Sequence, residues 1–429
     1  LRGLRHPAGG DRPSPQVARS GFGEPTAQNP ATASTPGRTD SEIQLAMGMT
    51  KVLAEIPALK ASYTTGHIFA LPANITVSTS YHCNSRCKTC NVWLLPNDDL
   101  RLDEWDLVFQ SLGDAPYWFT FSGGEPTLRE DLPEMVKSAY DHCKPGIINI
   151  PTNGILDKII PPRIERILQF VPKSELIINL SIDGIGEKHD EIRGVRNNWS
   201  RAMSTYGQLK DLQRDYKNLT LGIHTVISSY NVDSLPELCE FVQRELKPDS
   251  FITEIAEERV ELDTVGLGIT PTVEAYTVAI DALLESLRDN QLTPVAEVTQ
   301  AFRRQYYELV KRTLREQRQV IPCMAGVASA QIAPNGDVWT CCVRAESMGN
   351  LREHSYDFGE VWKTGKAKEL RRSIKAGECH CPLANAAYTN MLTHGPTVMK
   401  VAREVGHSRA VSFLGKRDRR PRRKTPSGG

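Results

Sequence analysis

Long apolar runs and an excess of one charge sign are both missing from this 429-residue sequence. No apolar stretch is long enough to cross a bilayer, and no basic-then-apolar signal peptide opens the chain. Because 52 basic residues nearly balance 51 acidic ones, bulk charge does not favour nucleic acid or an anionic membrane as a partner. We therefore expect a soluble, cytoplasmic protein.

The sequence has ten cysteines, which are few for a disulfide scaffold of this length but many for a protein in a reducing compartment. Clustered cysteines in such a compartment bind metal more often than they form disulfides. Cys143 and Cys239 stand alone in helix-like stretches, which predicts small buried core residues. The other eight fall in two groups: Cys83, Cys87 and Cys90, and then Cys323, Cys341, Cys342, Cys379 and Cys381.

The two ends of the chain lack apolar periodicity. Residues 1–46 are rich in Pro, Gly, Ser, Thr and Ala, a composition that predicts a disordered leader. An upstream-translation artefact is an alternative, because the chain starts with Leu while Met47 and Met49 follow. Residues 416–429 form a basic, proline-containing tail, for which a solvated tail is favoured over a nucleic-acid-binding arm.

Between the ends, strand-like runs alternate with helix-like segments. Such repeats predict parallel strands with helices outside them. A complete eight-fold barrel requires two further repeats, but residues 271–320 have the pattern of two helices. The sequence therefore predicts an α/β fold containing a partial (β/α)6 TIM-like barrel. Its strands are expected at 75–80, 117–124, 147–154, 175–184, 219–228 and 249–258.

The informative short motifs follow the first four of these strands. They are CNSRCKTC (83–90), GGEP (123–126), PTNG (151–154) and SIDG (181–184). Loops after strand carboxyl ends build the active sites of parallel β/α folds. We therefore expect these four loops to lie on one rim and to form the functional site.

Three thiolates on one short loop suit an iron–sulfur cluster, since iron–sulfur clusters are held by soft sulfur ligands. Zinc with one further ligand, such as His82, is the alternative, although structural zinc sites more often use two separated cysteine pairs. A three-thiolate cluster leaves one iron open to a substrate or cofactor.

The C-x3-C-x2-C loop after the first strand and GGEP after the second resemble the radical S-adenosylmethionine (radical SAM) superfamily. The resemblance implies a [4Fe–4S] cluster held by Cys83, Cys87 and Cys90, whose open iron is chelated by S-adenosylmethionine. It also implies that Glu125 either orients the methionine ammonium or braces the loop, while Thr89 stands where the family often has an aromatic residue. The implied contacts of the GGEP loop to S-adenosylmethionine are Gly123, Gly124, Glu125 and Pro126.

The stretch SIDGIGEKHDEIRG (181–194) is also similar to the family segment after the fourth strand. The similarity implies that Ser181 and Arg193 bind the cofactor. A strand-end cap for Ser181 and a surface ion pair for Arg193 are the alternatives. Asn153 in PTNG is either a turn former or a ligand contact.

The second cysteine group resembles the SPASM or twitch auxiliary-cluster domain. A hairpin with its turn at Asn335-Gly336, followed by an amphipathic helix leading to ECHC, carries the resemblance. Cys342 is the expected spare, because adjacent residues in an extended segment point oppositely. A zinc knot that includes His380 and His354 stays an alternative. One auxiliary [4Fe–4S] cluster is implied, with ligands Cys323, Cys341, Cys379 and Cys381.

The predicted organisation is a barrel at 47–270, a helical linker at 271–320, an iron–sulfur domain at 321–390 and a C-terminal helix at 391–415. The resemblance covers about residues 72–385. It implies an oxidoreductase that cleaves S-adenosylmethionine to a 5′-deoxyadenosyl radical, abstracts a substrate hydrogen atom and passes an electron to the auxiliary cluster. Flavodoxin or ferredoxin is the expected electron donor.

The substrate is harder to predict. We expect a small metabolite, such as a sugar or aminocyclitol, because the sequence before the first strand is too short for the leader-recognition domain of many peptide-modifying members. A peptide- or protein-modifying maturase of thioether, C–C crosslink or formylglycine type is the alternative, and a non-catalytic metal-binding module is a remote one. No catalytic side chain is assigned; Glu254 and Glu257 are either proton acceptors or solvated carboxylates.

Overall fold

The computed structural model describes residues 40–286 and 294–418. Most of the predicted leader (1–39) and of the basic tail (419–429) therefore lies outside the described residues. Helix α1 (Asp40–Thr65) begins inside the predicted leader. No helix in the described part is long and apolar enough to cross a membrane.

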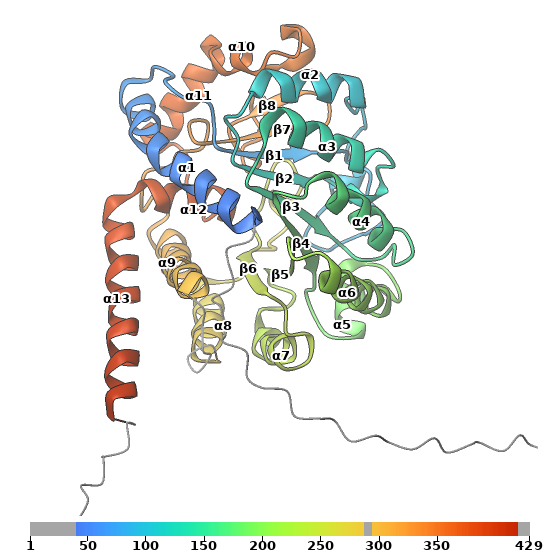
Figure 1. The fold of residues 1–429 in the computed structure, drawn as a ribbon, viewed down its shortest axis with the longest axis vertical. Coiled ribbons are helices and arrows are strands. Elements are labelled where there is room, and N and C mark those ends of the chain that lie inside the picture. The colour runs from blue at the N-terminus through green and yellow to red at the C-terminus, as the bar shows by residue number, and fades with distance from the viewer. Residues whose placement is uncertain (1–39, 287–293, 419–429) are drawn as a thin grey trace, which may run out of the picture. The chain divides into compact units, whose positions relative to one another are not determined.

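Nine strands of the described chain form one sheet, in the order β6-β5-β4-β3-β2-β1-β7-β8-β9. The first six are parallel, as predicted, and their helices lie outside the curved sheet (Figure 1). The partial barrel is thereby confirmed. Its strands are β1 (Asn74–Ser78), β2 (Trp118–Ser122), β3 (Ile147–Thr152), β4 (Glu175–Ser181), β5 (Leu219–Ile227) and β6 (Ser250–Ile255).

The outer face of the sheet is apolar and packs against the helices. Along β3, for example, Ile148 and Ile150 are fully buried, whereas Asn149 and Pro151 on the inner face are only half-buried. Parallel strands are usually buried on both faces, so a polar, half-exposed inner face is a departure that leaves room for a site. The covering helices are α2 (Leu102–Leu112), α3 (Leu132–Cys143), α4 (Ile160–Phe170), α5 (Glu187–Arg193), α6 (Asn198–Asp215) and α7 (Leu235–Phe241).

Both isolated cysteines are buried, as expected. Cys143 ends α3 with its Sγ 3.4 Å from the Phe109 carbonyl oxygen, and Cys239 lies in α7. Burial raises the pKa of each thiol to about 12, because the thiolate form loses hydration. Neither thiol belongs to the two cysteine groups, and each acts as a small core residue.

Two helices follow the barrel, α8 (Val273–Ser286) and α9 (Pro294–Glu316), which confirms the helices predicted for 271–320. The chain then returns to the sheet, where β7 (Ser329–Ile332) pairs in parallel with β1. Strand β8 (Asp337–Trp339) pairs antiparallel with β7 across the predicted turn, in which Gly336 has φ +90°. Strand β9 (Ser347–Asn350) was not predicted; it completes the sheet beside β8.

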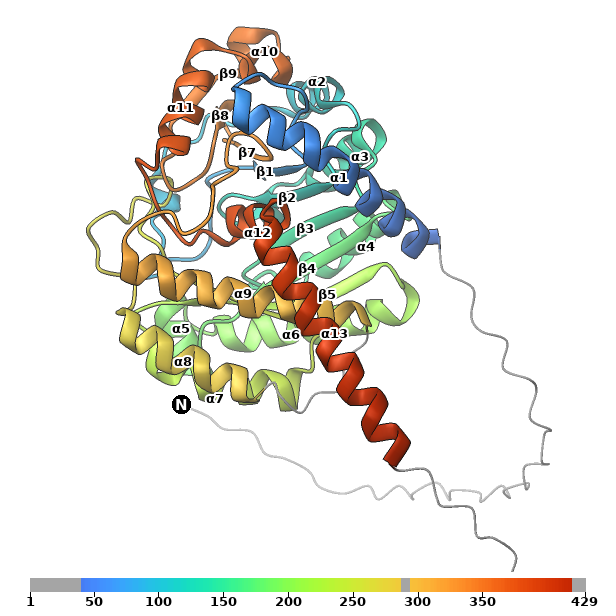
Figure 2. The same cartoon turned by 90° about the vertical axis from the view of Figure 1, so that its left-hand side faces the viewer.

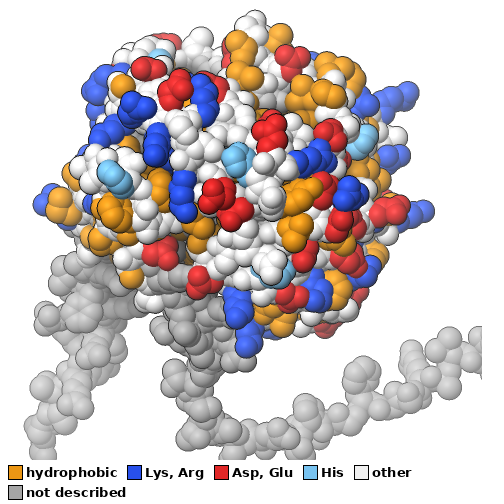
Figure 3. All heavy atoms as spheres, turned by 90° about the horizontal axis from the view of Figure 1, so that it is seen from above, with side chains coloured by type: hydrophobic (Ala, Val, Ile, Leu, Met, Phe, Trp, Pro, Cys, Tyr) orange, Lys and Arg blue, Asp and Glu red, His pale blue; other side chains and the backbone are white. Residues whose placement is uncertain are grey.

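The last helices cover this end of the sheet and the side of α9. Helices α10 (Phe358–Trp362) and α11 (Gly365–Ala376) contain the predicted amphipathic segment. The predicted C-terminal helix is split into α12 (Ala384–Thr393) and α13 (Gly395–Asp418), and α13 crosses α9 (Figure 2). Acidic and basic side chains are mixed on the face seen in Figure 3, in keeping with the balanced composition.

One buried carboxylate ties α2 to the segment between β9 and α10. Glu104 Oε1 accepts hydrogen bonds from Arg352 Nε at 3.0 Å and Tyr356 Oη at 2.7 Å, while its Oε2 accepts one from the Arg101 backbone N–H at 2.8 Å. Burial raises the pKa of Glu104, but these donors outweigh burial and lower it to about 2. The C-terminal region is thus anchored to the barrel by an ionised carboxylate.

Candidate functional site

The first three cysteines lie on the loop that leaves the carboxyl end of β1. Cys83, Cys87 and Cys90 are half-buried, and the Cys90 N–H donates to the Cys87 carbonyl at 3.1 Å. Burial raises the pKa of Cys83 to about 11 and that of Cys90 to about 12, and the neighbouring thiols of the loop add to both shifts. The sequence-predicted ligands are therefore close enough to act on one another.

Two glycines let the GGEP loop approach the cysteine loop. The Gly124 N–H donates to the Ser80 carbonyl at 2.7 Å, and a Cβ on Gly124 would lie 2.1 Å from the His82 carbonyl oxygen. A Cβ on Gly123, which has φ +112°, would lie 2.3 Å from the Ser80 carbonyl oxygen. Only glycine allows this backbone contact, so the second motif is built against the first.

Glu125 is buried and fully engaged within the protein. Its Oε1 accepts hydrogen bonds from Thr127 N (3.2 Å), Thr127 Oγ1 (2.5 Å) and Thr152 Oγ1 (2.8 Å). Its Oε2 accepts one from the Asn153 N–H at 2.8 Å. A carboxylate has about four acceptor positions. Of the two alternatives for Glu125, the geometry favours a brace that joins the loops after β2 and β3.

Asn153 extends this brace to the cysteine loop. Its Nδ2 donates to Asn84 Oδ1 at 2.7 Å, and its Oδ1 accepts from the Ile155 N–H at 3.0 Å. Asn153 is therefore a turn former whose remaining donor contacts the loop between Cys83 and Cys87. Within that loop, the Ser85 hydroxyl is buried and has no hydrogen-bond partner in the described part of the chain.

Arg193 lies directly against the cysteine loop. Its Nη1 donates to Cys87 Sγ at 3.7 Å, and its Nε lies 2.9 Å from Asp183 Oδ2. Arg193 is buried, with 9% of the residue exposed, so the surface-ion-pair alternative is wrong. Two backbone hydrogen bonds dock α5 onto the loop: Arg86 N donates to Arg193 O at 3.0 Å, and Lys88 N donates to Ile192 O at 2.9 Å. Ser181 lies half-buried at the carboxyl end of β4.

The four predicted auxiliary ligands also come together. Burial raises the pKa of Cys323 to about 12, and Cys341 and Cys379 raise it further. Burial raises the pKa of Cys381 as well, with contributions from Cys323 and Cys341. The thiols of these residues influence one another's pKa values, although they come from three separate segments of the chain.

Cys342 faces a different neighbour. Its Sγ accepts a hydrogen bond from Arg259 Nη1 at 3.7 Å, and it packs with Leu383 and Ala386. Burial raises the pKa of Cys342 well above that of a free thiol, although Arg259 opposes the shift. The predicted opposite orientation of the two adjacent cysteines is therefore consistent with the different partners of Cys341 and Cys342.

A segment after β6, residues 256–264, connects the two cysteine groups, and we call it the connecting wall. At one side the Asn91 N–H donates to the Leu262 carbonyl at 2.9 Å, next to Cys90. At the other the Val260 N–H donates to the Val343 carbonyl at 3.2 Å, next to Cys342. Sequence reasoning named only Glu257 in this segment and did not predict its contacts with the two cysteine groups.

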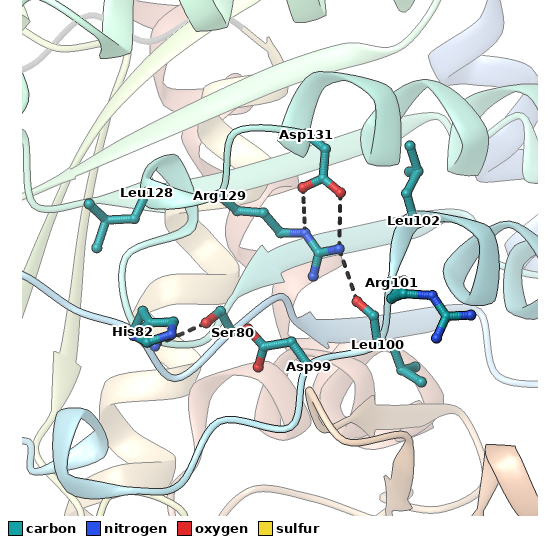
Figure 4. Close-up of a pocket in the computed structure, with 9 residues that line it drawn as sticks. All are labelled: Ser80, His82, Asp99, Leu100, Arg101, Leu102, Leu128, Arg129 and Asp131. Atoms are coloured by element: carbon teal, nitrogen blue, oxygen red, sulfur yellow. Dashed lines mark hydrogen bonds and ion pairs between the residues drawn. The ribbon is translucent and has the colours of Figure 1, made fainter.

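An open pocket of about 630 Å³ borders the cysteine loop through Ser80 and His82 (Figure 4). Arg129 forms its wall, bound to Asp131 Oδ1 at 2.7 Å and to the Leu100 carbonyl at 2.9 Å. His82 Nδ1 lies 3.4 Å from Asn97 Nδ2. In residues 40–286 and 294–418 no group of three or more His, Cys, Asp or Glu side chains surrounds a single ion position, and this includes both cysteine groups.

These features define a class: a partial (β/α)6 barrel with three cysteines on the loop after β1 and a second cysteine group beyond the barrel. A family model described as the radical SAM superfamily matches residues 77–242, and a model described as an iron–sulfur cluster-binding domain, SPASM, matches residues 323–382. The chain belongs to the radical SAM superfamily and carries a C-terminal SPASM iron–sulfur domain.

Several known proteins are similar to the chain. The PqqA peptide cyclase of Bradyrhizobium diazoefficiens is 27% identical over 42% of this chain and 46% of its own length, so the match spans less than half of that relative. The PqqA peptide cyclase of Xanthomonas euvesicatoria is 24% identical over 82% of this chain and 96% of its own length. The structure of Streptococcus suis SuiB bound to precursor peptide SuiA superposes with TM-score 0.53 at 18% identity, over 76% of this chain and 72% of that chain.

The residues present fit the cofactors of this family. The enzyme uses a [4Fe–4S] cluster with S-adenosylmethionine, and its SPASM domain binds auxiliary iron–sulfur. Three thiols on one loop leave one iron of a cube without a protein ligand, and four thiols elsewhere can complete a second cube. Iron requires thiolates, and the buried thiols here have raised pKa values, so cluster binding is expected to release protons.

Proposed function

We propose that this radical SAM enzyme is a maturase that oxidises a peptide or protein side chain. The connecting wall carries the proposal, because a substrate held against residues 256–264 faces both cysteine groups. Such a substrate can lose a hydrogen atom on one side and an electron on the other. The names of the similar proteins, two PqqA peptide cyclases and SuiB with its precursor peptide, support a peptide as the substrate class.

In this proposal the cysteine loop holds the cluster that activates S-adenosylmethionine, through Cys83, Cys87 and Cys90. The auxiliary cluster is held by Cys323, Cys341, Cys379 and Cys381. When bound, the first cluster and S-adenosylmethionine supply a 5′-deoxyadenosyl radical, which removes a hydrogen atom from an unactivated C–H bond. A reducing compartment such as the cytoplasm keeps the free thiols available as ligands, and flavodoxin or ferredoxin is the proposed donor of the initiating electron.

The protein's own residues set the geometry. Glu125 keeps the loops after β2 and β3 in place, so that backbone of Gly123, Gly124 and Pro126 lines the cofactor. Arg193 donates a hydrogen bond to Cys87 Sγ, which stabilises negative charge on that sulfur. Ser181 is the proposed polar contact of S-adenosylmethionine at the end of β4. These groups orient the reactants and do not exchange protons with the substrate.

Oxidation of a small metabolite, such as a sugar or aminocyclitol, is the second candidate. The inner face of the barrel favours it in one respect, because Asn149, Asn179 and His224 offer hydrogen bonds suited to hydroxyl and amino groups. The carbonyl of the Asn179 side chain is buried and has no partner in the described residues. This lining fits a compact polar substrate as well as a single side chain.

Anaerobic reconstitution with iron and sulfide tests the proposal. The wild type is expected to bind about eight irons and to form 5′-deoxyadenosine from S-adenosylmethionine after reduction with dithionite. The Cys83→Ala/Cys87→Ala/Cys90→Ala protein is expected to retain about four irons and to form none. Zinc in place of iron, or no 5′-deoxyadenosine from the fully loaded wild type, would contradict it.

The same enzyme then separates the two substrate classes. Incubation with short peptides and, separately, with sugars and aminocyclitols is followed by mass spectrometry for the loss of a pair of hydrogen atoms. Turnover-dependent loss from a peptide supports the maturase. Loss only from the small molecules refutes the maturase and leaves the radical SAM chemistry intact.

A further inference from the structure

The connecting wall concentrates buried negative charge. Glu254, Glu257 and Glu261 come from β6 and the wall, and Arg259 is the cation that acts on all three. Glu257 and Glu261 are 7% and 8% exposed. One guanidinium therefore faces three carboxyl groups, and a buried carboxylate is costly unless it is paired.

Two of these carboxyl groups have further partners. Glu254 Oε1 lies 3.5 Å from His224 Nε2, and the pKa of Glu254 is lowered because the influence of His224 and Arg259 outweighs burial. Glu261 Oε1 accepts hydrogen bonds from Ser78 Oγ at 3.2 Å and from Gln331 Nε2. Burial nevertheless raises the pKa of Glu261.

Glu257 is the exception. Arg259 holds only its Oε2, with Nη2 at 3.1 Å and Nε at 3.2 Å. Its Oε1 is buried and has no hydrogen-bond partner among the described residues. An unpaired buried carboxylate oxygen is costly, and buried polar groups in proteins nearly always have a hydrogen-bond partner. Burial raises the pKa of Glu257 to about 7, although Arg259 opposes the shift.

Glu257 lies on the side of the connecting wall that faces the proposed auxiliary cluster. It lies within electrostatic range of Cys381, whose pKa it raises, and its partner Arg259 donates to Cys342. Thiolate-ligated clusters carry net negative charge and do not compensate the wall. The positive charge that is missing from this region must come from a proton or from a bound molecule.

We propose that Glu257 binds a basic nitrogen of the substrate, an ammonium group, through its free Oε1. The inference rests on the proposed radical SAM function and adds the chemistry of the substrate to it. An ammonium group donates up to three hydrogen bonds and supplies the compensating charge. Both substrate classes can provide it, as a lysine side chain of a peptide or as the amino group of an aminocyclitol.

Matched ligand pairs test this on the reconstituted enzyme with S-adenosylmethionine bound. The peptide pair is acetyl-Gly-Lys-Gly-amide against its norleucine analogue, which has the same length without the charge. The ring pair is diaminocyclohexane against cyclohexanediol. Calorimetric titration at fixed ionic strength is expected to show the amine of at least one pair binding about tenfold more tightly than its neutral partner. The pair that discriminates identifies the source of the ammonium group.

The variant Glu257→Gln keeps the shape and removes the charge, so the preference for the amine is expected to disappear. Glu237→Gln, at an exposed position of α7, is the matched control and is expected to retain it. Iron content and circular dichroism establish that each variant is loaded and folded. If Glu257→Gln does not load, the wild-type comparison still decides.

Equal binding within both pairs, or no binding of either amine up to about 10 mM, overturns the inference and leaves Glu257 a protonated, inert carboxyl group. A preference that survives in Glu257→Gln also overturns it. These outcomes differ from failure of the proposed function, which appears as missing iron or missing 5′-deoxyadenosine in the wild type.

Discussion

The brace made by Glu125 leads to a prediction that separates its two possible roles. Four hydrogen bonds from Thr127, Thr152 and Asn153 saturate the carboxylate inside the protein. In Glu125→Gln, one carboxylate oxygen becomes an NH2 group. If that group takes the place of Oε2, it faces the Asn153 N–H at about the present 2.8 Å, and two donors then oppose each other.

The expected loss follows from these contacts. One charge-assisted hydrogen bond of about 1.5–3 kcal/mol disappears, and a buried N–H is left without an acceptor. The free energy of unfolding should therefore fall by about 2–4 kcal/mol, with a lower urea midpoint. Formation of 5′-deoxyadenosine should fall too, since the loop that lines the cofactor is no longer held. Glu130→Gln, at an exposed neighbouring position, should leave both quantities unchanged.

Urea unfolding of the unloaded protein and calorimetric titration with S-adenosylmethionine of the reconstituted protein measure the two effects separately. A Glu125→Gln protein of unchanged stability that no longer binds S-adenosylmethionine would refute the brace. It would assign Glu125 to the methionine ammonium instead.

Three further predictions concern other parts of the molecule. The folded-state pKa of Glu104 is depressed to about 2, so its contribution to stability is present above pH 4.5 and is lost as pH falls toward 2. Urea midpoints measured across this pH range should show that Glu104→Gln removes the pH-dependent contribution. Gly124→Ala should reduce iron bound by the cysteine loop, since its Cβ meets the His82 carbonyl at 2.1 Å, whereas Gly207→Ala meets nothing within 4 Å and should leave the iron content unchanged. Cys341→Ser should lose about four irons on analysis, while Cys342→Ser should keep them; the reverse result would exchange their roles.

The comparisons change the balance between the two substrate classes. The expectation of a small metabolite rested on the short sequence before the first strand, whereas the similar proteins include two PqqA peptide cyclases and SuiB bound to its precursor peptide SuiA. The connecting wall does not separate the two classes, because the ammonium group proposed to bind Glu257 can come from either of them. The matched ligand pairs therefore address the substrate directly.

Local sequence was enough to predict the six parallel strands and the cysteine loop. Alternation along each strand and the glycine-rich turns depend on neighbouring residues, so their pattern can be recognised in one short window. The hairpin turn at Asn335-Gly336 is of the same kind, because the backbone at Gly336 requires positive φ.

Tertiary structure alone decided the contacts between distant segments. Strand β7 returns to pair in parallel with β1, and β8 runs back antiparallel to it, so the second cysteine group lies toward the amino end of β1 while the first lies at its carboxyl end. Arg193 is a buried partner of Cys87, Glu125 is a brace, and Arg259 donates a hydrogen bond to Cys342. Each of these roles depends on burial and on a partner far along the chain. A local sequence pattern does not encode burial or the identity of a distant partner, because a side chain's charge and hydrogen bonds are set by the segments that fold against it.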